Sequence, residues 1–455
     1  MSTATTIGSL KGRIEGEVIE PGDAEYEKAR LPWNHAFDLR PAAVVRCASA
    51  ADVAAVVGFA RDAGLELAVR SGGHSAAGHG TTDGGIVLDL SPMKAIDLDL
   101  DGRTVWAETG LTAGELTTAL SEHGVAVGFG DTGSVGIGGI TTGGGIGYLV
   151  RKHGLTIDSV LAADVVTADG ELVRADATSH PDLFWAIRGG GGNFGVVTRF
   201  QYRLVDLPQI VGGLLVLPAT AETVAGFMAA AAQAPEALSA IANVMPCPPM
   251  PFLPAEVHGQ VIILALMCYA GDAESGERAM APFRALATPL ADMVKPGPYT
   301  DMYGPEDPDY HPLAVGRTFF LEHVATDEAA LIVERLTASD AAMRVCQLRV
   351  LGGAMARVPV EATAFAARSS RIIATCAAFY TGPDDLAART AWVEAFAGDL
   401  RQGDHAAYVN FIAEEGQARI RDAYPGATWD RLVAIKARYD PTNLFHRNQN
   451  IPPAG

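Results

Sequence analysis

The N-terminal part of the chain alternates between helical and strand-like spacing of its apolar side chains. Apolar residues recur at helical spacing between Ser49 and Gly64, and the serine with Asp52 three residues later resembles an N-terminal capping box. Other stretches are short and rich in β-branched residues, which is typical of strands. The ranges predicted as helices are 49–64 and 112–124, and those predicted as strands are 65–69, 85–90 and 103–107. This alternation indicates the α+β or α/β class.

A different pattern begins near residue 207. Alanine-rich amphipathic stretches there alternate with apolar runs, as expected for helices that pack on a sheet. A chain of 455 residues exceeds what one hydrophobic core usually serves, so we expect a second unit in this region. The predicted helices are 222–232 and 327–338, and the predicted strands are 214–217 and 261–267.

Glycines are dense between 133 and 147, and the run 136–147 reads GIGGITTGGGIG. Each glycine in a helix costs about 1 kcal/mol relative to alanine, so we predict that this run does not form a helix. Glycine also lets a ligand approach backbone N–H groups closely, as an anionic pyrophosphate requires. A tight turn explains any single glycine better. A cluster of this length, with a second loop RSGGHS at 70–75, favours dinucleotide binding.

The spacing GxGxxG also occurs, as GGGNFG at 190–195. A Rossmann nucleotide site needs a strand before these glycines and a helix after them. Here the order is reversed, because a helix is predicted at 179–187 and a strand at 196–200. The match therefore does not indicate a Rossmann fold, although its amides could still hold a nucleotide.

Together these motifs resemble the berberine bridge enzyme-like branch of the vanillyl-alcohol oxidase and para-cresol methylhydroxylase superfamily. Each motif alone is weak, but their combination is specific and spans nearly the whole chain. The motifs are RSGGHS at 70–75, TDGG at 82–85, VGIGG at 135–139, GGGIG at 143–147, RKHGL at 151–155, RGGGGNFG at 188–195, GGAMARV at 352–358, YVNF at 408–411 and YDPTNLF at 439–445.

The resemblance implies a two-part FAD-binding domain of the para-cresol methylhydroxylase type, with its core at about 37–207. An antiparallel-sheet substrate domain backed by helices would interrupt it. The expected segments are 1–206 for the first part of the FAD domain, 207–404 for the substrate domain and 405–455 for the returning tail.

The resemblance also implies that His74 bonds covalently to the 8α-methyl group of FAD. Many relatives carry a second tether, a cysteine at the position of Thr132, so we expect a single link here. Some relatives have a tyrosine where this chain has Ile146, and Tyr148 two residues later is a further catalytic candidate. The other cofactor-binding candidates are Arg70, Ser71, Gly72, Gly73, Ser75, Gly78, Gly133, Gly136, Gly138, Gly139, Gly143, Gly144, Gly147, Gly195, Val197 and Asn410.

Oxidation of an alcohol requires hydride transfer to the flavin and a base that removes the hydroxyl proton. By resemblance the preferred base is Tyr408, although a role in packing or in orienting the substrate stays open. A phenol with a pKa of about 10 is a poor base unless positive charge or hydrogen bonds lower that pKa. Lys436 and Arg357 are conceivable activators, and Tyr380 is a weaker catalytic candidate.

Composition and charge narrow the partners. The net charge of −19 disfavours nucleic acid and anionic membranes. The five cysteines lack CxxC spacing, so we expect neither a disulfide framework nor a bound metal. The N-terminus does not resemble a secretion signal and no apolar run has the length of a membrane span, which favours a cytoplasmic protein. We expect a small-molecule substrate, O₂ as the oxidant, and a monomer or homodimer.

The resulting hypothesis is an FAD-dependent oxidase that takes hydride from an alcohol or a related C–H donor. Its reduced flavin would be reoxidised by O₂ to give hydrogen peroxide, and its substrate would be a small hydrophobic molecule or a secondary metabolite. Oxidase and dehydrogenase behaviour are not distinguished by the motifs. The alternatives are a flavoenzyme for oxidative cyclisation or tailoring of a natural product, and a flavin-binding protein without turnover.

Overall fold

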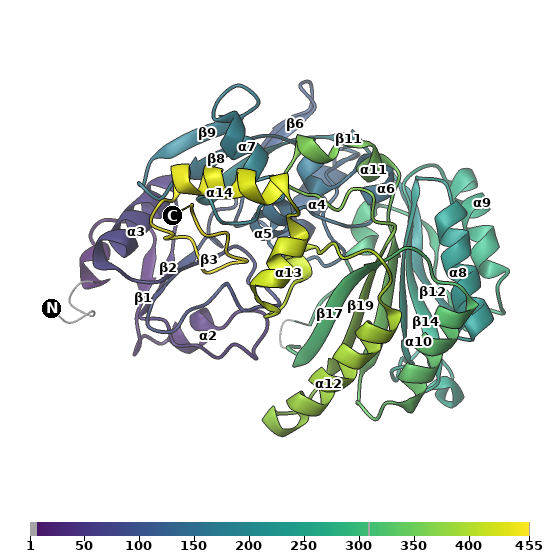
Figure 1. Ribbon diagram of the computed structural model, residues 1–455. Coiled ribbons are helices and arrows are strands. Elements are labelled where there is room, and N and C mark those ends of the chain that lie inside the picture. The colour runs from purple at the N-terminus through teal and green to yellow at the C-terminus, as the bar shows by residue number, and fades with distance from the viewer. Residues whose placement is uncertain (1–6, 308–309, 455) are drawn as a thin grey trace.

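The computed structural model describes residues 7–307 and 310–454, and these form two layered halves side by side (Figure 1). The N-terminal segments and the C-terminal helices build the half on the left of Figure 1. The middle of the chain builds the half on the right. The mixture of helices with parallel and antiparallel sheets confirms the α+β class.

The first sheet positions the loop that carries His74. Its order is β1-β2-β4-β3, with β2 and β3 parallel to β4 and β1 antiparallel to β2. Helix α3 packs beside it and begins as predicted, because Ser49 accepts a hydrogen bond from Asp52 N, and it ends at the left-handed Gly64. The elements are β1 (Glu17–Ile19), β2 (Ala43–Arg46), β3 (Leu67–Arg70), β4 (Ile86–Asp89), α2 (Tyr26–Arg30) and α3 (Ala50–Ala63).

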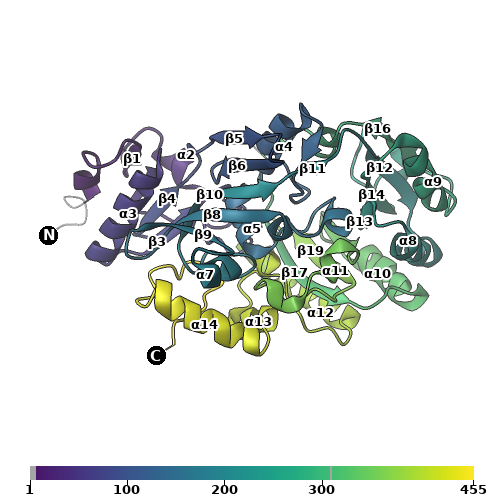
Figure 2. The same ribbon diagram turned by 90° about the horizontal axis from the view of Figure 1, so that it is seen from above.

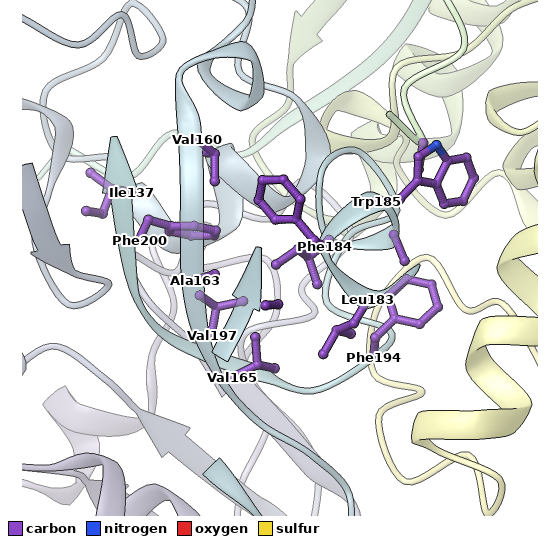
Figure 3. Close-up of a cluster of buried hydrophobic side chains, with 14 of the residues drawn as sticks. Ile137, Val160, Ala163, Val165, Leu183, Phe184, Trp185, Phe194, Val197 and Phe200 are labelled. Atoms are coloured by element: carbon purple, nitrogen blue, oxygen red, sulfur yellow. The ribbon is translucent and has the colours of Figure 1, made fainter. Parts of the chain in front are cut away.

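The second sheet is antiparallel, in the order β5-β6-β10-β8-β9. Its core lies between β8, β10 and helix α7. Figure 3 shows Leu183 and Phe184 of α7 beside the strand that carries Val160 and Val165. A short pair, β7 with β11, lies beside it. The elements are β5 (Ile96–Asp99), β6 (Thr104–Glu108), α4 (Ala113–Ser121), β7 (Val125–Ala126), β8 (Val160–Val166), β9 (Leu172–Asp176), α7 (Pro181–Ala186), β10 (Val196–Arg203) and β11 (Val205–Asp206).

The third sheet is formed by the middle of the chain and is entirely antiparallel. Its main order is β15-β12-β14-β13-β18-β19-β17, and β16 also pairs with β12. Helices cover one face (Figures 1 and 2), where apolar side chains such as Phe227, Phe283 and Phe396 meet the strands. The strands are β12 (Ile210–Pro218), β13 (Leu238–Pro246), β14 (Val261–Tyr269), β15 (Ala291–Asp292), β16 (Lys295–Gly297), β17 (Ala314–Leu321), β18 (Arg344–Val350) and β19 (Ile372–Phe379), and the helices are α8 (Ala221–Gln233), α9 (Ala273–Arg284), α10 (Thr326–Ala338) and α12 (Pro383–Leu400).

The opposite face of this sheet meets the glycine-rich segment. Phe320 and Ile373 belong to one apolar cluster with Ile146 and Tyr408. Ile241 belongs to another cluster that also holds Tyr148. The inner face of the third sheet therefore roofs the region that the glycine motifs occupy.

The C-terminal segment returns to the first half, where its helix α14 (Ala427–Tyr439) packs against α7 (Figures 1 and 2). Lys436 is fully buried there, and its Nζ donates to Asp440 at 2.6 Å, to Asn193 O at 2.8 Å and to Phe445 O at 2.9 Å. The returning helices are α13 (Gly416–Ala423) and α14 (Ala427–Tyr439). The shorter helices are α5 (Ile137–Gly143), α6 (Val150–His153), α11 (Ala354–Arg357), η1 (Gly8–Leu10), η2 (Thr156–Asp158), η3 (Ala255–Val257), η4 (Tyr299–Met302), η5 (Val360–Ala362) and η6 (Val409–Phe411).

One prediction on local structure is wrong. The glycine run was expected not to form a helix, yet α5 occupies Ile137–Gly143. Ile137 is fully buried and its N–H bonds to Leu111 O at 2.9 Å, so tertiary packing offsets the poor helix propensity. The glycines also allow close contacts, because a Cβ on Gly143 would collide with the Asn410 amide.

Candidate active site

Two glycine loops dock directly on one another. The first follows β3 and includes Gly72, and the second precedes α5 and includes Gly136. A Cβ on either glycine would collide with the backbone of the other. Ser71 Oγ donates to Thr109 O at 2.5 Å and accepts from Gly138 N at 3.3 Å. This close approach requires glycine and holds the His74 loop against the glycine-rich segment.

The first loop has the properties of an anion cradle. Gly73 has a φ of +73°, and among the described residues the backbone N–H groups of 72–75 have no protein acceptor. Successive free N–H groups of this kind favour a pyrophosphate. The side chain of Arg70 does not supply the positive charge, because its Nη2 bonds to Asp89 at 2.9 Å and to Ala29 O at 2.6 Å. The free backbone N–H groups of this loop could therefore bind an anionic group without help from a cationic side chain.

The side chain of His74 extends from this loop and is held in a fixed orientation. Its ring stacks on Trp33 with centroids 4.8 Å apart and planes 19° apart. Its Nε2 lies 3.0 Å from Ser134 Oγ. The Glu306 carboxylate in turn accepts from Ser134 N at 2.9 Å and from Ser134 Oγ. Burial lowers the pKa of His74 to about 4, although Glu306 opposes the shift, so the ring is neutral at pH 7.

Tyr408 approaches the other end of the same glycine segment. It is 2% exposed, and its Oη accepts from Gly145 N and from Asn410 Nδ2, both at 2.9 Å. Asn410 Nδ2 also donates to Ile140 O at 3.1 Å. A Cβ on Gly144 would press on the Tyr408 ring. The side chains of Tyr408 and Asn410 are thus hydrogen-bonded to the backbone of the glycine segment.

The protonation of Tyr408 is set by opposing effects. Burial raises its pKa, and the hydrogen bonds from Gly145 N and Asn410 oppose that rise. The phenol is therefore protonated at pH 7, and Gly145 N and Asn410 Nδ2 both donate to its oxygen. Among the described residues, the Tyr408 hydroxyl proton has no acceptor.

The two activators suggested for Tyr408 are wrong. The Lys436 charge is neutralised by Asp440, and Arg357 forms an exposed ion pair with Glu236 at 2.5 Å. The cation near the phenol is Arg349, which lies over the Phe411 ring at 5.4 Å and weakly lowers the Tyr408 pKa.

The other tyrosine candidates differ in position. Tyr148 is 1% exposed and burial strongly raises its pKa, while its Oη makes only a long contact of 3.5 Å with Asp131 O. Tyr380 follows β19, is half-buried, and bonds through its N–H to Leu313 O. The structure brings Tyr148 under the third sheet but does not place Tyr380 in the cluster around Tyr408.

Several cofactor candidates lie where the backbone packs closely against another segment or takes a positive φ. Gly78 has a φ of +67° and packs on Phe37, and a Cβ on Gly147 would collide with Phe129 O. Gly195 has a φ of +150°, and Val197 O accepts from Thr109 Oγ1 at 2.7 Å. Three other candidates are not buried, namely Ser75, Thr132 and Gly139. The backbone O of Gly133 accepts a hydrogen bond from Gly114 N at 2.9 Å.

The sequence motifs missed a polar row across the inner face of the third sheet. Thr318, Thr375, Gln347 and Asn243 occupy paired positions on β17, β19, β18 and β13. Gln347 Nε2 donates to Asn243 Oδ1 at 2.7 Å, and the two threonine hydroxyls are 2.9 Å apart. Alternating apolar and polar positions within each strand are the only signal that could have found this row.

Arg349 lies one row closer to the glycine segment, between Ile241 and Ile373. Its Nη2 bonds to Asp131 Oδ2 at 2.8 Å and to Gln347 Oε1 at 2.6 Å, while its buried Nη1 has no partner. The inner face therefore combines apolar side chains, a polar row, and one buried guanidinium nitrogen that has no partner among the described residues.

The site combines an anion cradle, a histidine at one end of the glycine segment, a phenol at the other end, and the inner face of the third sheet above them. This combination is that of a flavin-dependent oxidoreductase. The chain matches the family model of the FAD binding domain over residues 41–176, and the model described as berberine and berberine like over 407–452. It belongs to the berberine bridge enzyme-like family of FAD-linked oxidases and binds FAD, which confirms the predicted family and cofactor.

Curated relatives align over almost the full chain. The (R)-6-hydroxynicotine oxidase of Paenarthrobacter nicotinovorans is 30% identical over 97% of this chain and 98% of its own. The xylooligosaccharide oxidase of Thermothelomyces thermophilus is 30% identical, with 96% and 92% covered. The solved structure of 6-hydroxy-D-nicotine oxidase from Arthrobacter nicotinovorans superposes with a TM-score of 0.86 at 27% identity, covering 97% of this chain and 98% of that one.

In the part of the chain that the structure describes, no cluster of three or more His, Cys, Asp or Glu side chains could hold a metal ion. Within 7–307 and 310–454, no helix has the length and hydropathy to cross a membrane. All five cysteines are buried free thiols.

Proposed function

We propose that this protein is an oxidase with FAD tethered through His74 alone. It takes hydride from an alcohol or related C–H donor, uses Tyr408 as the base, and passes the electrons to O₂ to give hydrogen peroxide. The observation that carries the proposal is that His74 and Tyr408 contact opposite ends of one glycine segment, at Ser134 and Gly145. A flavin held along this segment would meet the tether at one end and the phenol at the other.

Bound FAD supplies the hydride acceptor, and the protein supplies position and proton transfer. The free N–H groups of 72–75 would hold the diphosphate, and the neutral His74 ring offers an unprotonated nitrogen as nucleophile. The Tyr408 oxygen accepts N–H bonds from Gly145 and Asn410, which stabilise a phenolate when the phenol loses its proton. These same bonds orient the phenol for a substrate hydroxyl.

The substrate is proposed to be small, with an apolar portion and at least one hydrogen-bonding group. Apolar side chains of the inner face, such as Ile373 and Phe320, support the first feature, and the row from Thr318 to Asn243 supports the second. The two curated relatives are named for a hydroxynicotine and for a xylooligosaccharide. Both substrate types present polar groups, so neither name alone is transferred to this chain.

The decisive experiment follows the flavin after acid denaturation of wild type and of His74→Ala, together with peroxide release from a panel of alcohols, amines and sugars. Yellow colour that stays with wild-type protein and leaves His74→Ala supports the single tether. Colour released from wild type would refute the tether while leaving FAD binding intact. Flavin that no donor reduces, or that O₂ does not reoxidise, would refute the oxidase activity.

A further inference from the structure

We propose that Glu306, acting through Ser134, is the proton acceptor for covalent attachment of FAD to His74. This inference rests on the proposed His74 tether and adds the residues that would form it. Glu306 belongs to the segment between η4 and β17, in the middle part of the chain, whereas His74 and Ser134 belong to the FAD-binding half. The step would therefore depend on contact between the two halves.

The hydrogen bonds determine which nitrogen of His74 carries the proton. Glu306 accepts two bonds from Ser134, through its N–H and through its O–H. Because the serine proton points to the carboxylate, the oxygen lone pair faces His74 Nε2 at 3.0 Å. Nε2 must then be the N–H donor, and Nδ1 keeps its lone pair. The relay leaves Nδ1 as the nucleophile.

Burial makes removal of the Nε2 proton necessary. Bond formation at Nδ1 would convert the neutral ring to a cation unless Nε2 loses its proton. The ring of His74 is half-buried, and its desolvation disfavours that cation and lowers the pKa of the ring. Trp33 stacks on one face of the ring and limits its rotation. A proton path through Ser134 to an exposed carboxylate removes the charge and leads to solvent.

The step balances with O₂ as oxidant. A bond forms between Nδ1 and the 8α carbon, while one C–H bond of the methyl group and the Nε2–H bond break. The Nε2 proton passes to Ser134 as the serine proton passes to Glu306, and the methyl proton leaves to water. The two electrons pass to the isoalloxazine and then to O₂, so each tether formed consumes one O₂ and releases one hydrogen peroxide.

The test compares full-length wild type with Glu306→Gln, Glu306→Asp and Ser134→Ala, produced under riboflavin limitation and incubated with FAD and O₂. Total FAD is measured from absorbance, and tethered FAD from acid-precipitated protein over time. Glu256→Gln is the matched control, because this exposed carboxylate lies on η3, away from the relay.

We expect the tethering rate of Glu306→Gln and Ser134→Ala to fall about 100-fold, within the usual contribution of a positioned base, with untethered FAD still bound. Glu306→Asp should be intermediate and Glu256→Gln unchanged. Wild-type rates in Glu306→Gln would overturn the relay while the tether stands. Release of all wild-type flavin by acid would overturn tether and relay together.

The linkage atom provides a second readout that does not depend on any variant. NMR of the flavin peptide from digested wild type distinguishes attachment at Nδ1 from attachment at Nε2. The relay requires Nδ1. Attachment at Nε2 would overturn it, because the atom bonded to Ser134 would then be the nucleophile itself.

Discussion

The substitution Tyr408→Phe separates a catalytic phenol from a packing residue. It keeps the ring that packs against Phe365 and Phe411 at centroid distances of 5.9 and 4.9 Å. It removes only the oxygen that accepts bonds from Gly145 N and Asn410 Nδ2. Because the ring contacts stay, FAD should remain bound and the chain should fold.

The expected magnitudes follow from these two contacts. Two buried N–H groups lose their acceptor, at about 1 to 3 kcal/mol of unfolding free energy for each group that finds no other partner. Loss of a general base lowers a rate by about 10² to 10⁴, which corresponds to roughly 3 to 5 kcal/mol of activation free energy. The rate effect should therefore exceed what a modest loss of stability could produce at 25 °C.

The assay is anaerobic reduction of the bound flavin by substrate in single turnovers. Tyr148→Phe is the matched control, because the Tyr148 hydroxyl makes only the 3.5 Å contact with Asp131 O. Burial raises the Tyr408 pKa above its usual value, so the phenolate fraction and the wild-type reduction rate should still be rising at pH 10. A Tyr408→Phe rate within about threefold of wild type, or a wild-type rate independent of pH, would refute the base assignment.

Three further predictions concern stability. Gly72→Ala should lower the unfolding free energy of flavin-free protein by about 1 to 3 kcal/mol in urea titrations, because the new Cβ would collide with Gly136. Gly139→Ala is the control and should not lower that free energy, because a Cβ there meets nothing within 4 Å. Lys436→Met should cost about 3 to 5 kcal/mol by the same measurement, since it leaves Asp440 buried without its cation, and an equally stable variant would contradict the pairing. Burial lowers the pKa of His79 from 6.5 to about 4, so the folded state binds fewer protons at this residue than the unfolded state does. The stability of the protein should therefore fall as the pH falls from 6.5 to 4. The variant His79→Gln should flatten that fall in thermal melts, and an unchanged slope would contradict the prediction.

Elements with local signals were predictable from sequence. The helix from Ser49 to Gly64 carries its own cap and stop, and both are used in the structure. Helix α5 was missed because its stability comes from contacts distant in sequence, such as the packing of Gly143 against Asn410. The burial of Lys436 could not be predicted locally either, because one of its acceptors is the backbone O of Asn193, 243 positions away.

The candidate site divides in the same way. His74 and Tyr408 stand in short local motifs, RSGGHS at 70–75 and YVNF at 408–411, so both could be located by number. The relay from Glu306 and the row from Thr318 to Asn243 depend on strand register and on contact between the two halves. No local spacing encodes such contacts, and a single sequence cannot supply them.

The contrast between local motifs and contacts distant in sequence also concerns how members of the family distinguish their substrates. Relatives named for a hydroxynicotine and for a xylooligosaccharide are each 30% identical to this chain, so overall identity does not separate substrate classes. Under the proposed function, the glycine segment would contact FAD, whereas the inner face of the third sheet would contact the substrate. Arg349, with a buried and unpartnered Nη1 beside Gln347, gives this chain a charged donor at that face. Substrate choice should therefore follow the side chains at strand positions such as these rather than the motifs that identify the family.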